Sequence, residues 1–262
     1  MEKTTNPISH ISNKSLSIQV SLSGFCFSVY NKVENKTEIV KNLSIDTSKP
    51  ILEQLSYYFD EYSSYLYPCD DVRVLYENNL FTLVPNSYFN EELLSDYLKY
   101  TIKTYPTDSF GYDEIETNNC KVVYVPYMHI NNFLLDYYPT FNYQHKITAF
   151  INKCVALNIT DEKKVYCYVN NSSFDVLVLD GSKIMYCNSF DYQTSEDFLY
   201  YVLFALEQIK IDRETAPVYL IGDAKNTQKV FDLAYTYIRN CEILKNTKST
   251  DNSESMHYFI LN

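Results

Sequence analysis

The sequence predicts an α/β protein built from two copies of one β-β-β-α-β unit. A hairpin of alternating apolar residues occurs twice, and a shift of 149 residues carries Phe25 to Phe174 and Val29 to Val178. Each hairpin is followed by a third strand, an amphipathic helix and a further strand. A repeat of this kind indicates that one structural unit occurs twice, so we assign the helices and strands separately in each copy.

The first copy begins with a hairpin whose strands, Leu16–Val20 and Phe25–Val29, alternate apolar and polar residues around a polar turn, Ser21–Gly24. Lys36–Ile45 is expected to be the third strand, and Val72–Tyr76 the last. Between them, a helix beginning near Ser48 is predicted because apolar residues recur at helical spacing. These residues are Ile51, Leu55, Tyr58, Tyr62 and Tyr65.

The second copy repeats this order from Val165. Its hairpin strands flank the polar turn Asn170–Ser173, and Asp180 with Gly181 predicts a type I′ turn into a strand over Lys183–Tyr192. Thr194 and Asp197 form a capping-box pattern before a helix. That helix carries Phe198, Val202, Leu206 and Ile209 on one face, and Val218–Ile221 is the strand that follows. Each helix is expected to pack on the sheet of its own copy.

The remaining segments connect or extend the copies. Strands are expected at Leu80–Val84, Val122–Val125 and Cys241–Leu244; helices are expected after Asn90 and over Tyr127–Tyr138, Gln144–Leu157 and Lys225–Ile238. A boundary near Thr160 gives an N-terminal half of residues 1–160 and a C-terminal half of residues 161–262. Lys245–Ser255 predicts a polar loop, and the apolar Met256–Leu261 is expected to dock on the second half.

The composition of the chain excludes several classes of function. The chain has 262 residues, of which 46% are hydrophobic and 21% charged, and this balance is typical of a globular protein. Its net charge of −11 argues against nucleic acid and anionic lipid as partners. The first residues lack the apolar core of a secretory signal, and no apolar run reaches the ~20 residues of a membrane span. We therefore expect a cytoplasmic protein without membrane insertion.

Cysteine and histidine spacing predicts neither a disulfide framework nor a metal centre. The seven cysteines contain no C-x-x-C pair, and the four histidines show none of the zinc-binding spacings. A cysteine nucleophile paired with His129 or His145 stays open as an alternative, although buried reduced cysteine is the commoner state.

The duplicated unit, with each copy entered by a hairpin with a small polar turn, resembles the actin-like ATPase superfamily, whose fold is a duplicated ribonuclease H-like unit. Leu16–Tyr30 and Val165–Asp180 resemble more closely an uncharacterised bacterial family assigned that fold, a family of unknown function. The resemblance implies two halves with a cleft between them, where active members bind ATP and magnesium.

The residues that carry this chemistry in active members are altered here. The metal-holding Asp of the first hairpin falls on Ser21 and its Gly on Ser23, with Gly24 one place late. In the second hairpin the Asp falls on Asn170. Neutral side chains cannot replace the charge that anchors a divalent metal or orients the attacking water.

Two further positions of the resemblance also depart from the active pattern. Ser172 stands where the second hairpin would have its Gly, followed by Ser173. The adenosine-binding Gly-Gly is reduced to Gly222 and Asp223, and an acid there disfavours phosphate. The ordinary interpretation is favoured at these positions: the turn residues are typical of hairpin turns, and Gly222 suits a strand end packed closely on the following helix.

We therefore predict a non-catalytic binding or scaffolding protein that has lost the ATP-hydrolysis residues, has no catalytic residues, needs no cofactor and binds a protein partner. The alternative is a diverged nucleotide-binding kinase or ATPase that uses the cleft between the halves. In that alternative Ser21, Ser23, Gly24, Asn170, Ser172, Ser173, Gly222 and Asp223 line the site, with ATP and magnesium as ligands. A structural assembly component is a third option.

Overall fold

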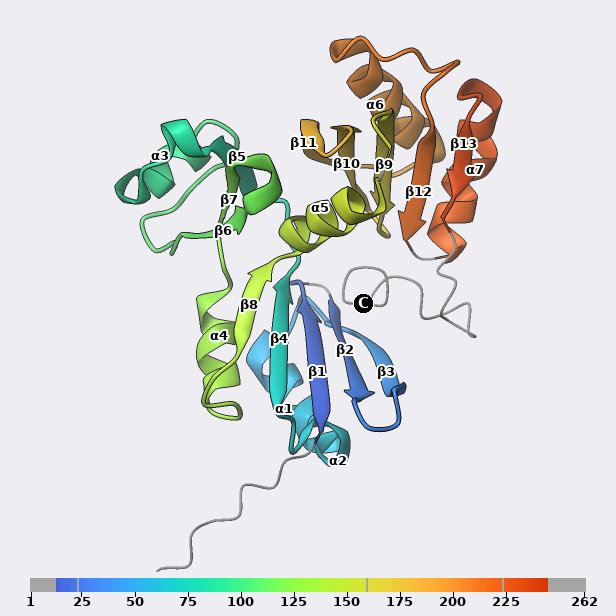
Figure 1. Ribbon diagram of the computed structural model, residues 1–262. Helices are drawn as coiled ribbons and strands as arrows, with labels where there is room; N and C mark the ends of the chain where they lie inside the picture. Colours follow the sequence, from blue (N-terminus) through green and yellow to red (C-terminus); the bar gives the residue numbers. More distant parts are fainter. Residues whose placement is uncertain (1–12, 23, 159, 223, 245–262) are drawn as a thin grey trace, which may run out of the picture. The chain divides into compact units, whose positions relative to one another are not determined.

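The computed structural model describes residues 13–22, 24–158, 160–222 and 224–244 (Figure 1). The chain forms two compact units. Of the described residues, unit 1 contains 13–77 and 127–143, and unit 2 contains 78–126 and 144–244. Thr160, where the sequence repeat suggests a boundary, lies within unit 2. A division of the chain into halves at that point stays a prediction.

Unit 1 is built on a five-stranded sheet in the order β3-β2-β1-β4-β8. Its strands are β1 (Lys14–Val20), β2 (Gly24–Asn31), β3 (Lys36–Ser44), β4 (Asp71–Tyr76) and β8 (Asn142–His145), the last of which crosses into unit 2. Its helices are α1 (Ile51–Glu61), α2 (Ser63–Leu66) and α4 (Met128–Leu135). The alternation in β2 buries Phe25 and Phe27, and Phe59 of α1 packs with its ring centre 5.8 Å from that of Phe25.

Unit 2 contains a second five-stranded sheet, in the order β11-β10-β9-β12-β13, and a three-stranded sheet, β5-β7-β6. The strands of the larger sheet are β9 (Lys163–Val169), β10 (Ser173–Asp180), β11 (Lys183–Asp191), β12 (Val218–Gly222) and β13 (Cys241–Ile243). The smaller sheet has β5 (Phe81–Pro85), β6 (Gly111–Ile115) and β7 (Cys120–Tyr124). The helices are α3 (Leu94–Leu98), α5 (Lys146–Leu157), α6 (Ser195–Gln208) and α7 (Ala224–Tyr237), with 3-10 turns at Asn86–Tyr88, Glu91–Leu93 and Glu116–Asn118.

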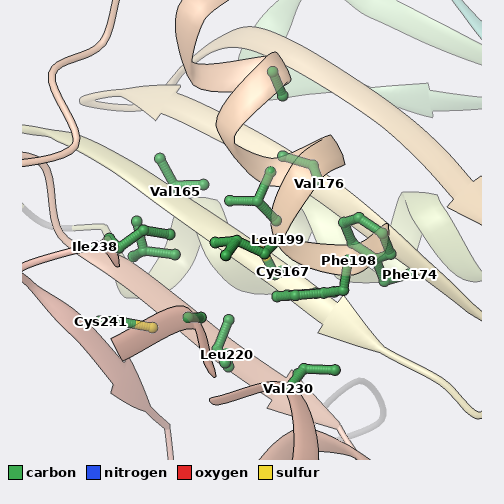
Figure 2. Packing of buried hydrophobic residues seen from close by; sticks show 14 of the residues in the cluster. Val165, Cys167, Phe174, Val176, Phe198, Leu199, Leu220, Val230, Ile238 and Cys241 are labelled. Atoms are coloured by element: carbon green, nitrogen blue, oxygen red, sulfur yellow. The ribbon is translucent and has the colours of Figure 1, made fainter. Parts of the chain in front are cut away.

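The core of the larger sheet lies where α6 and α7 cover one face (Figure 2). Phe174 and Val176 of β10 meet Phe198 of α6, and Leu220 of β12 lies among the same fully buried residues. The predicted capping box is present: Thr194 accepts a hydrogen bond from the Asp197 amide, and Asp197 accepts one from the Thr194 amide. This box fixes the first turn of α6 against the sheet.

The duplication predicted from the sequence is confirmed. Leu16 pairs with Val29 in one hairpin, and Val165 pairs with Val178 in the other, so the 149-residue shift preserves the strand register. The two hairpins lie in separate sheets, and in each the first strand also pairs in parallel with the strand after the helix. The same β-β-β-α-β topology therefore occurs twice.

Several element assignments need correction. The expected helix over Gln144–Leu157 begins at Lys146, because His145 is extended and its Nδ1 accepts the Ile147 amide as an N-cap; the residues before it form β8. The strand β6 is absent from the sequence-based assignment, and the helix expected over Tyr127–Tyr138 spans Met128–Leu135. The expected type I′ turn is wrong, because Gly181 has φ +58° while Ser182 is not in the positive-φ region that such a turn requires.

Lys245–Ser255 and Met256–Leu261, for which a loop and a docked segment are expected, lie outside the described residues. Within the parts of the chain that the structure describes, none of the helices combines the length and apolarity needed to cross a bilayer.

Candidate functional site

The candidate site in unit 2 is formed where β9 and β12 end. These strands are parallel neighbours, and Gly222 at the end of β12 pairs with Val169 at the end of β9. The polar turn follows Val169 directly, and α7 begins at Ala224. The carboxyl ends of parallel strands meet at one edge of a sheet, which is the usual ligand position in α/β folds. The topology thus brings Asn170–Ser173 and Gly222 to one edge.

The turn Asn170–Ser173 is held by its own backbone and by one tyrosine. The Asn170 amide donates to the Ser173 carbonyl at 2.9 Å. Tyr192, which follows β11, donates its hydroxyl to the Asn170 carbonyl at 2.6 Å and its amide to the Ser172 carbonyl at 3.0 Å. Sequence reasoning missed Tyr192, because nothing in the sequence marks an aromatic residue after β11 as a clamp on this turn. These hydrogen bonds fix the backbone of the Asn170–Ser173 turn, which is the segment that would have to bind a phosphate.

The corresponding turn of unit 1 follows the same design. The Ser21 amide donates to the Gly24 carbonyl at 2.9 Å, which matches the Asn170–Ser173 bond under the 149-residue shift. The Ser21 hydroxyl donates to the same carbonyl at 3.2 Å, a bond that an ionised carboxylate could not make. The Ser21 side chain therefore stabilises the turn. Ser23 and Asp223, which were also predicted to line the site, lie outside the described residues.

Position 222 requires glycine because the backbone of β9 lies very close to it. Its φ is +148°, and a Cβ at this position would lie 2.2 Å from the Val169 carbonyl oxygen and 3.1 Å from Thr227 Oγ1. Thr227 Oγ1 is buried and has no hydrogen-bond partner among the described residues. The equivalent position in unit 1 is Tyr76, since Val20 pairs with Tyr76 as Val169 pairs with Gly222. The glycine is thus demanded by strand packing, and the two halves differ at this point.

One carboxylate does lie at the equivalent edge of unit 1. Glu77 follows β4, its amide donates to the Val20 carbonyl at 2.9 Å, and its carboxylate accepts Gln19 Nε2 at 2.7 Å. Burial, and after it the Glu77 carboxylate, raises the pKa of the Cys26 thiol. Sequence reasoning missed Glu77, although it directly follows Tyr76, the position in unit 1 that is equivalent to Gly222.

Comparison with known proteins places the chain in a family. The family described as "Protein of unknown function (DUF3822)" matches residues 3–241. The chain belongs to this family. No curated protein matches it.

Two solved structures show the fold of this DUF3822 protein. One is a Bacteroides thetaiotaomicron VPI-5482 protein with an actin-like ATPase fold and unknown function, with a TM-score of 0.80, 22% identity, and coverage of 92% of this chain and 94% of that one. The other comes from the PilM-PilN type IV pilus biogenesis complex, with a TM-score of 0.63, 10% identity, and coverage of 94% and 96%. The protein therefore has the α/β actin-like ATPase fold that the resemblance implied.

One histidine and two cysteines of this DUF3822 protein, His145, Cys154 and Cys187, are structural groups. His145 is fully buried, and burial followed by the Lys146 charge lowers its pKa to about 3. Its Nδ1 accepts the Ile147 amide and its Nε2 lies 3.1 Å from the Asn78 carbonyl, so both ring nitrogens are occupied. Burial raises the pKa of the Cys154 and Cys187 thiols, which suppresses the thiolate. Across the described ranges, no cluster of three metal-ligating side chains occurs.

A buried ion pair lies on the face of the larger sheet opposite to the one that α6 and α7 cover. Lys146 of α5 and Asp175 of β10 are 1% and 0% exposed, and Lys146 Nζ lies 2.9 Å from Asp175 Oδ2. Ser189 of β11 donates its hydroxyl to Asp175. This pair is absent from the residues predicted from the sequence. A pair so deeply buried fixes α5 to one position on the sheet, since removal of one partner would leave an uncompensated charge.

Proposed function

We propose that this DUF3822 protein is a non-catalytic actin-like binding or scaffolding protein of the cytoplasm that has lost the residues for ATP hydrolysis. The observation that carries the proposal is the matched pair of turns. Ser21 and Asn170 stand where active members of the superfamily are expected to have acids, and each amide closes its own turn at 2.9 Å.

The physical reason is the charge that phosphoryl transfer requires. Catalysis of this kind depends on a metal held by carboxylates and on a positioned water, and neither Ser nor Asn supplies that charge. Strand packing accounts for Gly222 without a ligand, because a Cβ there would lie 2.2 Å from the Val169 carbonyl oxygen.

A protein partner is supported by two observations. The exposed face of α6 carries Tyr200 and Phe204, which are 63% and 41% exposed and whose rings stack with centres 6.2 Å apart. Exposed aromatic side chains are enriched at interfaces between proteins. The solved structure from the PilM-PilN type IV pilus biogenesis complex, one chain of which has the fold of this chain, is itself a complex.

The experiment is an ATP turnover assay on the whole chain. With millimolar ATP and magnesium we expect phosphate release equal to a no-protein control. A Ser21→Asp/Asn170→Asp double variant is also expected to show no turnover, because the backbone bonds that close both turns remain. Turnover by the wild-type chain above that control would contradict the proposal.

The second candidate function is that of a diverged nucleotide-dependent kinase or ATPase, and Glu77 is the observation that favours it. Its half-buried carboxylate lies at the end of β4, next to the end of β1, where it could attract a divalent cation. In this alternative, nucleotide binding depends on magnesium and is lost in a Glu77→Gln variant.

A further inference from the structure

Helix α6 carries a stripe of exposed side chains along one face. This α6 stripe consists of Glu196, Tyr200, Phe204 and Glu207, which follow one another at steps of four, four and three residues. At about 3.6 residues per turn, these steps keep all four side chains on one side of the helix. The opposite side is buried in the core of unit 2 and carries Phe198, Leu199, Val202, Ala205 and Leu206. The α6 stripe is therefore a surface that the core of unit 2 does not use.

The two aromatic residues of the stripe are held in place by further rings. The Tyr200 and Phe204 rings have their centres 6.2 Å apart and their planes 17° from parallel. Tyr200 also contacts Tyr201 at 5.3 Å between ring centres, and Tyr201 stacks on Phe190 of β11 at 4.8 Å. Because these contacts already order the exposed rings, a partner that binds them has a smaller entropic cost to meet.

The two ends of the α6 stripe are negatively charged. Glu196 lies one turn before Tyr200, and Glu207 lies one turn after Phe204. Both carboxylates are exposed, and neither forms an ion pair within the described ranges of the chain. The sequence of α6 contains no lysine or arginine, and the net charge of the chain is −11. These charges favour a cationic partner and disfavour a second copy of this acidic chain.

A guanidinium group suits this combination of rings and carboxylates better than an ammonium group does. The guanidinium group is planar, so it stacks on the faces of aromatic rings, and it donates N–H groups to a carboxylate in pairs. An ammonium group is more strongly hydrated and offers neither the planar face nor the paired donors. The chemistry of the α6 stripe therefore matches arginine side chains.

The spacing within the α6 stripe matches a second helix. Residues four apart on a helix are separated by ~6 Å along its axis, and the Tyr200 and Phe204 ring centres are 6.2 Å apart. Arginines four residues apart on a neighbouring helix can therefore meet the two rings in register. Rows of side chains at this spacing are also the ridges through which helices commonly pack.

We propose that the α6 stripe binds an arginine-bearing helix of a partner protein, with guanidinium groups on Tyr200 and Phe204 and at Glu196 and Glu207. This inference rests on the proposed function as a protein-binding module and names the chemistry of its partner. The two fail separately, because ATP turnover would contradict the proposed function, whereas failure of the binding experiment below contradicts only the assignment of the partner.

Fluorescence anisotropy with the whole chain and a labelled synthetic peptide tests the proposal. The peptide is an alanine-based helix with arginine at every fourth position. We expect saturable binding that weakens as salt is added, and no binding of a control peptide with glutamate in place of each arginine. A second control peptide has the same arginines but a central proline that breaks the helix, and it should bind about tenfold more weakly because its arginines lose their register.

An aromatic double variant locates the peptide on the stripe. Tyr200→Ala/Phe204→Ala removes both rings, and the Kd of the arginine peptide should rise about tenfold because two contacts between guanidinium and ring are lost. Leu52→Ala/Tyr57→Ala is the matched control, since it removes two exposed large side chains from another helix, α1. This control should leave the Kd unchanged.

A charge double variant tests the acidic ends of the stripe. Glu196→Gln/Glu207→Gln should raise the Kd about threefold, as expected for two exposed ion pairs. Glu53→Gln/Asp60→Asn removes the same charge from exposed positions of α1 and should leave the Kd unchanged. Equal effects of these two variants would mean that the peptide responds only to the overall charge of the chain.

Absence of binding of the arginine peptide to the wild-type chain would overturn the proposal. Equal Kd values for the wild-type chain and both α6 variants would overturn it as well, and so would equal effects of each α6 variant and its α1 control. Binding of the proline-containing peptide as tight as that of the helical one would overturn the assignment of a helix. Weaker binding confined to the two α6 variants, together with weaker binding of the proline-containing peptide, would support the proposal.

Discussion

Replacement of Gly222 by alanine tests whether strand packing demands the glycine. The φ of +148° is unfavourable for a residue with a Cβ and costs ~1–3 kcal/mol. The new Cβ would also lie 2.2 Å from the Val169 carbonyl oxygen, so β12 would have to move away from β9, at a further ~1–3 kcal/mol. We therefore expect the free energy of unfolding to fall by about 2–6 kcal/mol.

A thermal melt followed by circular dichroism measures this loss. At ~2–4 °C per kcal/mol for a chain of this size, the melting temperature should fall by roughly 4–24 °C. Gly111→Ala is the matched control, because its Cβ would meet the Tyr124 ring at an ordinary 3.6 Å and its φ is not positive. A Gly222→Ala melting temperature within 1 °C of that of Gly111→Ala would refute the packing argument.

Two further predictions concern the buried polar groups of unit 2. Lys146→Met and Asp175→Leu should each cost ~3–5 kcal/mol in urea unfolding, whereas the double variant should cost less than either, because no buried charge is left unpaired; costs that simply add would contradict a direct pair. The pKa of His145 is lowered from 6.5 to about 3, so the stability it contributes is present above pH 6.5 and is lost as the pH falls. Between pH 6.5 and pH 5 the loss should be about 2 kcal/mol, at ~1.36 kcal/mol per pH unit. This loss should disappear in His145→Asn, and an unchanged slope in that variant would contradict this assignment.

The duplicated fold could be predicted from the sequence because the alternating apolar residues of the hairpin recur in the second copy. Phe25 and Phe174 lie at equivalent positions of two strands, and the polar turns before them close through equivalent backbone bonds. Period-2 alternation over several residues is a strong local signal. The short strand β8, with the sequence Asn-Tyr-Gln-His, has no such alternation, and it exists because β4 offers it an edge.

The candidate site could be predicted only in part. The turns and Gly222 follow from motif positions, whereas the Lys146–Asp175 pair arises only when α5 packs on the sheet. Its one sequence signal is Asp175, a charged residue inside the apolar run Phe174–Leu179. A strand buried on both faces has no place for an unpaired carboxylate, so this residue indicates a buried cation without identifying it.

The most direct test of the central claim is isothermal titration calorimetry of the whole chain with ATP, with and without magnesium. The account predicts no binding heat at millimolar ATP in either condition, because neither turn offers a carboxylate for the metal and both turns are closed by their own backbone. Binding that requires magnesium and is lost in Glu77→Gln would contradict it, and would show that the fold has kept a nucleotide site built around a different acid.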